Sequence, residues 1–145
     1  SAYNKSIFTF MVGGFLLPMA FTFSKVFKTN WKVKDNPLQP LGLWFNFAQL
    51  FYFPFLIFTL IKYPEYFVMA YAIITGAHFF PYAWFYMEKG YAVMAGLISL
   101  GALLLGLNVS SAYTYLIPVM MSICLTILGL IIFISYKRKE LIYQQ

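Results

Sequence analysis

The sequence predicts an all-α fold, a polytopic transmembrane helix bundle with five spans. Of its 145 residues, 62% are hydrophobic and 10% are charged, whereas roughly a quarter of the residues of a soluble domain are charged. The charged residues are clustered and leave uncharged runs of 19, 26, 22 and 47 residues. About 20 apolar residues cross a bilayer core, so the last run is long enough for two crossings. Because a backbone in lipid must satisfy its own hydrogen bonds, each span should be helical.

In order along the chain, the spans should cover residues 7–24, 41–61, 66–87, 91–107 and 113–135. The connections after the second, third and fourth spans are short, so consecutive helices should be antiparallel neighbours. We therefore expect residues 1–145 to form a single integral membrane domain. One proline lies in each of four spans and predicts a kink there; these prolines are Pro18, Pro54, Pro81 and Pro118.

The net charge of +6 indicates membrane topology rather than a nucleic-acid partner, because the basic residues collect beside the spans. Segments 25–40 and 137–140 hold most of them, so both should be cytoplasmic. Assigning alternate connections by parity places 8 of the 10 Lys and Arg residues inside and Ser1 outside. An outside N-terminus predicts a further hydrophobic segment before this chain. Trp31, in the first basic segment, should lie at headgroup level.

Three stretches carry a resemblance to a known family. They are KDNPL at 34–38, LWFNFAQL at 43–50 and GAHFFPYAWFY at 76–86. Together they resemble a family of small multi-pass bacterial membrane proteins of unknown function. The resemblance implies a bacterial membrane and a hydrophobic segment preceding this chain. Together with the basic tail, it predicts a multi-pass protein of the bacterial cytoplasmic membrane with a cytoplasmic C-terminus. It implies no activity.

The third span carries a polar stripe. Its members recur at steps of three and four residues and so share one helix face; they are Tyr71, Thr75, His78, Tyr82 and Tyr86. His78 is the single histidine of the chain, and Pro81 three residues later lacks an N–H and should disturb the helix beside the imidazole.

Two amides of the second span, Asn46 and Gln49, also share a face. An α-helix rises about 1.5 Å per residue, so positions can be counted inward from the opposite ends of two antiparallel spans. By this count Gln49 should lie at the same depth in the membrane as His78, and Asn46 at the same depth as Tyr82. Ligand binding is the functional hypothesis for this cluster, and its candidate residues are His78, Gln49, Asn46, Tyr82 and Thr75. The structural alternative is that the same side chains only hydrogen-bond helices together.

Several kinds of chemistry lack the residues they need. None of the five predicted spans contains Asp, Glu, Lys or Arg, so the charged pairs of ion-coupled carriers are missing. One histidine and one cysteine, Cys124, cannot make a typical metal centre, so we expect no metal and no cofactor. No motif pairs His78 with a nucleophile, which favours a non-enzymatic protein over an enzyme.

The fourth span carries small residues that let two helix backbones approach closely. They are Ala92, Ala95, Gly96, Ser99, Ala102 and Gly106. The partner helix belongs either to the same chain or to a second copy of it.

Three functional hypotheses follow. The first is an integral membrane protein that binds or transports a small uncharged or amphiphilic molecule, a lipid included, through the mid-membrane polar cluster. The alternative is a non-catalytic scaffold or accessory subunit that associates with itself or with another membrane protein. It would do so through the face of the fourth span that carries the small residues, here called the small face. A third is an intramembrane enzyme with His78 as acid or base. The expected surroundings are the lipid bilayer, without nucleic acid.

Overall fold

The computed structural model describes residues 1–26 and 38–143, apart from the side chains of residues 16, 17, 39 and 139–143. Within these ranges the regular structure is entirely helical, as the sequence predicts. The elements are α1 (Ala2–Val26), α2 (Gln39–Leu50), α3 (Phe53–Lys62), η1 (Pro64–Tyr66), α4 (Phe67–His78), α5 (Phe80–Phe85), α6 (Gly90–Asn108), η2 (Ser111–Tyr113) and α7 (Leu116–Tyr143). Most of the first basic segment, with Trp31, lies outside the described residues.

Four helical stretches of the described chain are long and apolar enough to cross a membrane. They are Ala2–Val26, Pro40–Lys62, Gly90–Asn108 and Ser111–Arg138, and they correspond to the first, second, fourth and fifth predicted spans. The prediction of a transmembrane helix bundle is thereby confirmed.

The predicted third span, 66–87, consists of two shorter helices, α4 and α5, joined at Phe79. Pro81 explains the junction because it has no N–H to donate to the preceding turn. Around Pro81, two backbone N–H groups donate to the carbonyl three residues earlier instead of four. Phe79 N–H donates to the Gly76 carbonyl and Tyr82 N–H to the Phe79 carbonyl, both at 3.1 Å. With 12 and 6 residues, neither helix alone reaches the length of about 20 that a crossing needs.

The second predicted span has a similar junction between α2 and α3. The N–H groups of Phe51 and Tyr52 bond three residues back, at 3.2 Å each, just before Pro54. The other two prolines differ from expectation. Pro18 lies inside a continuous α1, and Pro118 lies in the first turn of α7, where a missing N–H costs nothing.

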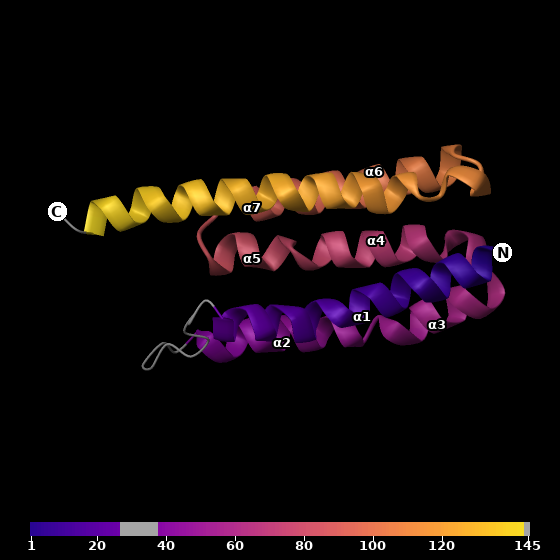
Figure 1. Ribbon diagram of the computed structural model, residues 1–145, viewed down its shortest axis with the longest axis horizontal. Helices are drawn as coiled ribbons and strands as arrows, with labels where there is room; N and C mark the ends of the chain where they lie inside the picture. The colour runs from indigo at the N-terminus through magenta and orange to yellow at the C-terminus, as the bar shows by residue number, and fades with distance from the viewer. Residues whose placement is uncertain (27–37, 144–145) are drawn as a thin grey trace.

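The helices form three layers (Figure 1). α4 and α5 lie in the middle, between α6 with α7 on one side and α1 with α2 and α3 on the other. The closest packing joins α4 to α6. Ile98 is fully buried, and a Cβ built on Gly76 would lie 2.7 Å from its side chain. Such close approach stabilises helix pairs in lipid through dispersion contacts, since burial from water contributes little there.

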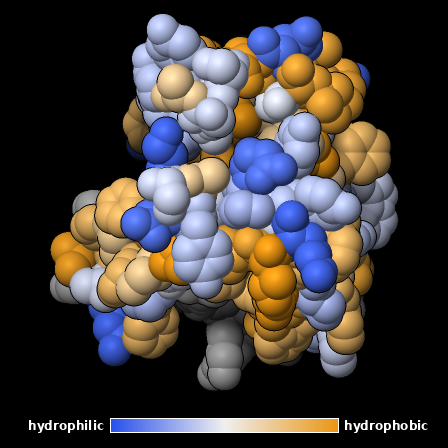
Figure 2. Space-filling model, turned by 90° about the vertical axis from the view of Figure 1, so that its right-hand side faces the viewer, coloured by the Kyte–Doolittle hydropathy of each residue, from blue (hydrophilic) through white to orange (hydrophobic). Residues whose placement is uncertain are grey.

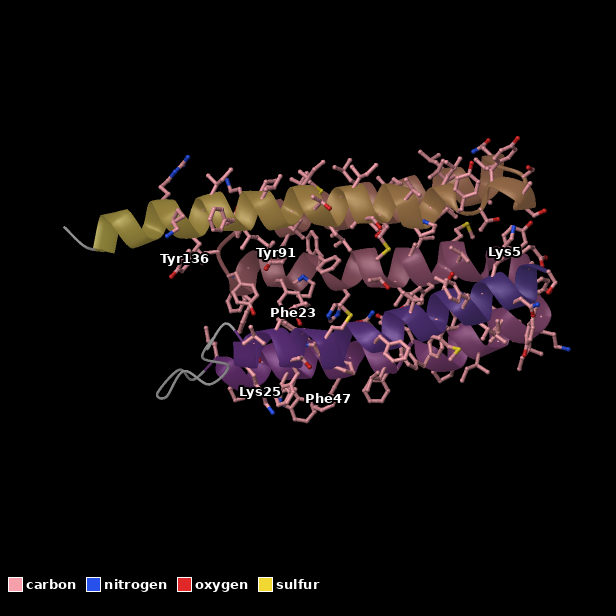
Figure 3. The ribbon with its side chains drawn as sticks, in the orientation of Figure 1. Lys5, Phe23, Lys25, Phe47, Tyr91 and Tyr136 are labelled. Atoms are coloured by element: carbon pink, nitrogen blue, oxygen red, sulfur yellow. The ribbon has the colours of Figure 1, made fainter. Side chains whose placement is uncertain are left out.

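The two ends of the bundle differ. Ser1–Ser6, residues 62–66 and the α6–α7 connection lie together and are here called the N-terminal end; the α5–α6 connection lies towards the other end (Figure 1). Figure 2 looks onto the N-terminal end, where hydrophilic residues gather over the middle of the face and hydrophobic ones are frequent towards its rim. Lys5 lies at this end and Lys25 towards the opposite one (Figure 3). A polar end face and apolar sides fit a bundle whose long axis crosses a bilayer.

Candidate functional site

The carbonyl oxygen of Gly42 joins two of the predicted site residues. It accepts a hydrogen bond of 2.9 Å from Asn46 Nδ2, one turn further along α2, and another of 3.3 Å from the Tyr82 hydroxyl on α5. A carbonyl oxygen can accept more than one hydrogen bond. The structure therefore brings Asn46 and Tyr82 together at one acceptor and ties α5 to α2.

Aromatic rings surround Tyr82, which is buried. The His78 imidazole meets its ring edge-on at 5.2 Å between centroids, Phe45 does so at 5.8 Å, and Tyr86 stacks on it at 5.7 Å. Tyr91 from α6 stacks in turn on Tyr86 at 5.6 Å. These packed rings hold Tyr82 in place, so its hydroxyl position is fixed by the fold. Tyr91 does not belong to the polar stripe predicted from the sequence, so no sequence pattern indicated this contact.

Gln49 and His78 lie at nearby levels of two antiparallel segments. Gly42 on α2 bonds to Tyr82 on α5, and Gln49 lies seven residues after Gly42. At about 1.5 Å of rise per residue, this register sets Gln49 opposite the turn of α4 that ends at His78. Both side chains are half-buried.

No hydrogen bond joins the Gln49 amide to the His78 imidazole, and neither group bonds to any other residue that the structure describes. Thr75 differs from both, because its Oγ1 donates to the Tyr71 carbonyl at 2.8 Å within α4. The residues of the cluster therefore fall into two groups. Asn46, Thr75 and Tyr82 donate to backbone carbonyls, whereas the imidazole and the Gln49 amide keep their hydrogen-bonding capacity.

The polar stripe of α4 also meets α1. The Tyr71 ring packs edge-on against Phe10 at 6.1 Å, and its hydroxyl occupies the space that a Cβ on Gly13 would take. Gly13 thus lets α1 approach α4 on the N-terminal side of Thr75. Further along, α1 is largely exposed, with Phe15 62% and Met19 50% accessible.

The chemistry available at this cluster is neutral hydrogen bonding. It offers an imidazole, two carboxamides, two hydroxyls and the backbone near two helix junctions, and none of these groups carries a formal charge while the imidazole is neutral. Among the described residues, no three His, Cys, Asp or Glu side chains come together as metal ligands.

The small face of α6 packs inside the chain. Ala95 and Ala102 are buried, Ser99 Oγ donates to the Ile73 carbonyl of α4 at 3.3 Å, and a Cβ on Gly106 would meet Met69. The partner of this face is therefore α4 of the same chain. The prediction that Gly96 belongs to the face is wrong, because Gly96 is exposed and a Cβ there would meet nothing within 4 Å.

Two adjoining cavities open at the N-terminal end, and sequence reasoning missed both. One of about 200 Å³ lies between η1, the end of α6 and η2; the other, of about 260 Å³, lies between the start of α1, η1 and η2. Glu65, Ser111 and Thr114 line both, and no member of the mid-membrane cluster lines either. The sequence signal was limited to Glu65 and Lys5, two isolated charges beside predicted spans.

These features define a class: a small helical bundle with helices apolar enough to cross a membrane and a neutral polar cluster among them. The chain belongs to a family of unknown function, DUF7010, whose family model matches residues 1–135. The resemblance seen in the sequence to an uncharacterised family is thereby confirmed. Comparison with curated proteins and with solved structures gives no match.

Proposed function

We propose that this protein binds a small uncharged or amphiphilic molecule, such as a lipid, at the mid-membrane polar cluster of Asn46, Gln49, Thr75, His78 and Tyr82. One observation carries the proposal. The His78 imidazole on α4 and the Gln49 amide on α2 are both half-buried, and neither has a hydrogen-bond partner among the described residues.

Polar groups without partners are costly in an apolar medium, by about 1–3 kcal/mol each on the scale of protein mutations. A ligand hydroxyl or carbonyl that reaches these groups would recover that cost, because imidazole and carboxamide each donate and accept. None of the five spans predicted from the sequence contains a charged side chain, which favours a ligand that is neutral where it is bound.

Helix junctions on both facing segments support the same site. α2 meets α3 at Phe51–Tyr52, and α4 meets α5 at Phe79. Interrupted helices line the substrate sites of many transporters, where the freed backbone groups take part in binding. Two junctions near the level of His78 and Gln49 therefore favour transport of the bound molecule as an extension of the proposal.

For orientation, we propose that the C-terminal end faces the cytoplasm of a bacterial cell. The proposal depends on the basic residues around 25–34 and 137–139 and on the positive-inside rule. A reporter enzyme that is active only in the cytoplasm, fused after residue 145, should be active, and the same reporter placed within residues 62–64 should be silent.

The test of binding uses native mass spectrometry of the full chain released from detergent micelles, together with untargeted extraction of what co-purifies. The wild-type protein should carry a bound small molecule that His78→Ala and Gln49→Ala both lose. Ser122→Ala is the matched control, because Ser122 is exposed on α7 and bonds within its own helix at 2.8 Å. Equal occupancy in all four proteins would refute the proposed site.

A further inference from the structure

The cavity between η1, the end of α6 and η2, here called the first end cavity, combines features that attract a cation. We propose that it binds a small organic ammonium group, with the Glu65 carboxylate as counter-ion. The site is separate from the mid-membrane cluster, since Glu65 precedes His78 by 13 residues and so lies about 20 Å from it along the helix.

The Glu65 carboxylate is available for a ligand. It lines both cavities and is exposed, and it forms no ion pair or hydrogen bond with any residue that the structure describes. An ammonium group that enters the cavity would give this carboxylate a charged partner.

The end of α6 adds negative potential at the same place. The Leu105 carbonyl accepts from Val109 N–H at 2.9 Å, whereas Gly106 and Leu107 have no later helical N–H because α6 ends at Asn108. Gly106 and Leu107 both line the first end cavity. Carbonyls left at the C-terminus of a helix favour cations nearby.

Aromatic rings complete the cavity. Tyr66 and Tyr113 line it and are partly exposed, and tyrosine faces attract ammonium groups, quaternary ones included. The residues lining this cavity include no Lys or Arg. Lys5 lines the adjoining cavity, and its Nζ donates to the Ser111 carbonyl at 3.3 Å. A volume of about 200 Å³ suits a headgroup-sized ion rather than a large ligand.

The test uses the full chain in an uncharged detergent with choline chloride and ethanolamine hydrochloride as probes, and sodium chloride at equal ionic strength as the reference. Binding is followed by calorimetry and by chemical shifts of the Tyr66 and Tyr113 rings. We expect saturable binding that Glu65→Gln weakens about tenfold or more, the loss expected for one charge-assisted contact. Glu88→Gln, at the other end of the α4–α5 segment, should bind as the wild type does.

Tyr113→Leu provides a second variant that leaves Glu65 in place. It should weaken choline more than ethanolamine, because the quaternary ion depends more on the aromatic face. Wild-type affinity in Glu65→Gln, or a titration that the sodium chloride reference reproduces, would overturn the proposal.

Two sources could supply the ammonium group, a free solute or a lipid headgroup. Repeating the choline titration in phosphatidylethanolamine nanodiscs and in phosphatidylglycerol nanodiscs separates them. Competition by phosphatidylethanolamine alone assigns the site to a headgroup, and equal choline affinity in the two bilayers assigns it to a free ion.

Discussion

The Tyr82 hydroxyl donates to the Gly42 carbonyl at 3.3 Å and so joins α5 to α2 across 40 positions of sequence. This hydrogen bond is one of the few side-chain bonds between helices in the described part of the chain, since most hydroxyls there bond within their own helix. It fixes the level at which the α2–α3 segment meets the α4–α5 segment, and therefore which residues of the mid-membrane cluster face one another.

Tyr82→Phe tests that bond. The substitution keeps the ring against His78 and Phe45 and removes the donor, while Gly42 still accepts from Asn46. We expect the free energy of unfolding in mixed micelles to fall by about 0.5–1 kcal/mol, as for other hydrogen bonds between membrane helices. Tyr136→Phe is the control, because Tyr136 is exposed on α7 and its loss should be neutral. A loss of the same size in both variants would contradict the role of the bond.

Gly76→Ala tests the packing of α4 on α6. The added Cβ would lie 2.7 Å from Ile98 Cγ2 and 2.9 Å from Ser99 Oγ, in a buried position. Overpacking of this kind costs about 1–3 kcal/mol. In Gly96→Ala the new methyl meets open space, so stability should stay the same or rise by up to about 1 kcal/mol from helix propensity. Thermal unfolding of the two variants measures the difference, and a Gly76→Ala protein as stable as wild type would show that the interface can relax.

Pro81→Ala tests the origin of the α4–α5 junction. With an N–H at residue 81, the bond to the Ala77 carbonyl becomes available, and we expect a continuous helix over residues 67–85. Amide hydrogen exchange at Phe79 and Phe80 should be slower than in the wild type, and the new amide at residue 81 should be protected from exchange. Pro18→Ala is the matched control, since α1 is already continuous there, and its exchange pattern should change little. Unchanged exchange in Pro81→Ala would mean that packing around Phe79, not the proline, holds the junction.

Much of the fold could be predicted from composition, because long uncharged apolar runs have few alternatives to membrane helices. The junction beside Pro81 was also predictable, from the missing N–H. The outward position of Gly96 was not, since it lies about a quarter turn from the centre of the small face, and only the placement of α4 decides which edge is covered.

The candidate site, like the fold, could be predicted from the sequence only in part. The equal depth of Asn46 and Tyr82 followed from helix rise, but their shared acceptor, the Gly42 carbonyl, could not, since glycine has no side chain to mark it. The cavities at the N-terminal end form where η1 and η2 meet, one of them with the end of α6 and the other with the start of α1. These segments are far apart in sequence. Their meeting depends on helix packing, which no local pattern encodes.

The final prediction separates a binding site from structural hydrogen bonding. In ligand-free protein, His78→Phe keeps a ring beside Tyr82 and Gln49→Leu keeps bulk, and each removes a polar group that has no partner among the described residues. The free energy of unfolding should therefore stay the same or rise, because no hydrogen bond is lost and a costly polar group leaves an apolar site. Ser99→Ala, which loses its bond to the Ile73 carbonyl, should instead lower the free energy of unfolding by about 0.6 kcal/mol.

The opposite outcome would make the mid-membrane cluster structural. If His78→Phe and Gln49→Leu each destabilise the protein, and the double variant is no less stable than either single variant, the two groups bond to each other in the membrane. Stability retained together with loss of the co-purifying molecule is the combination that only a binding site produces.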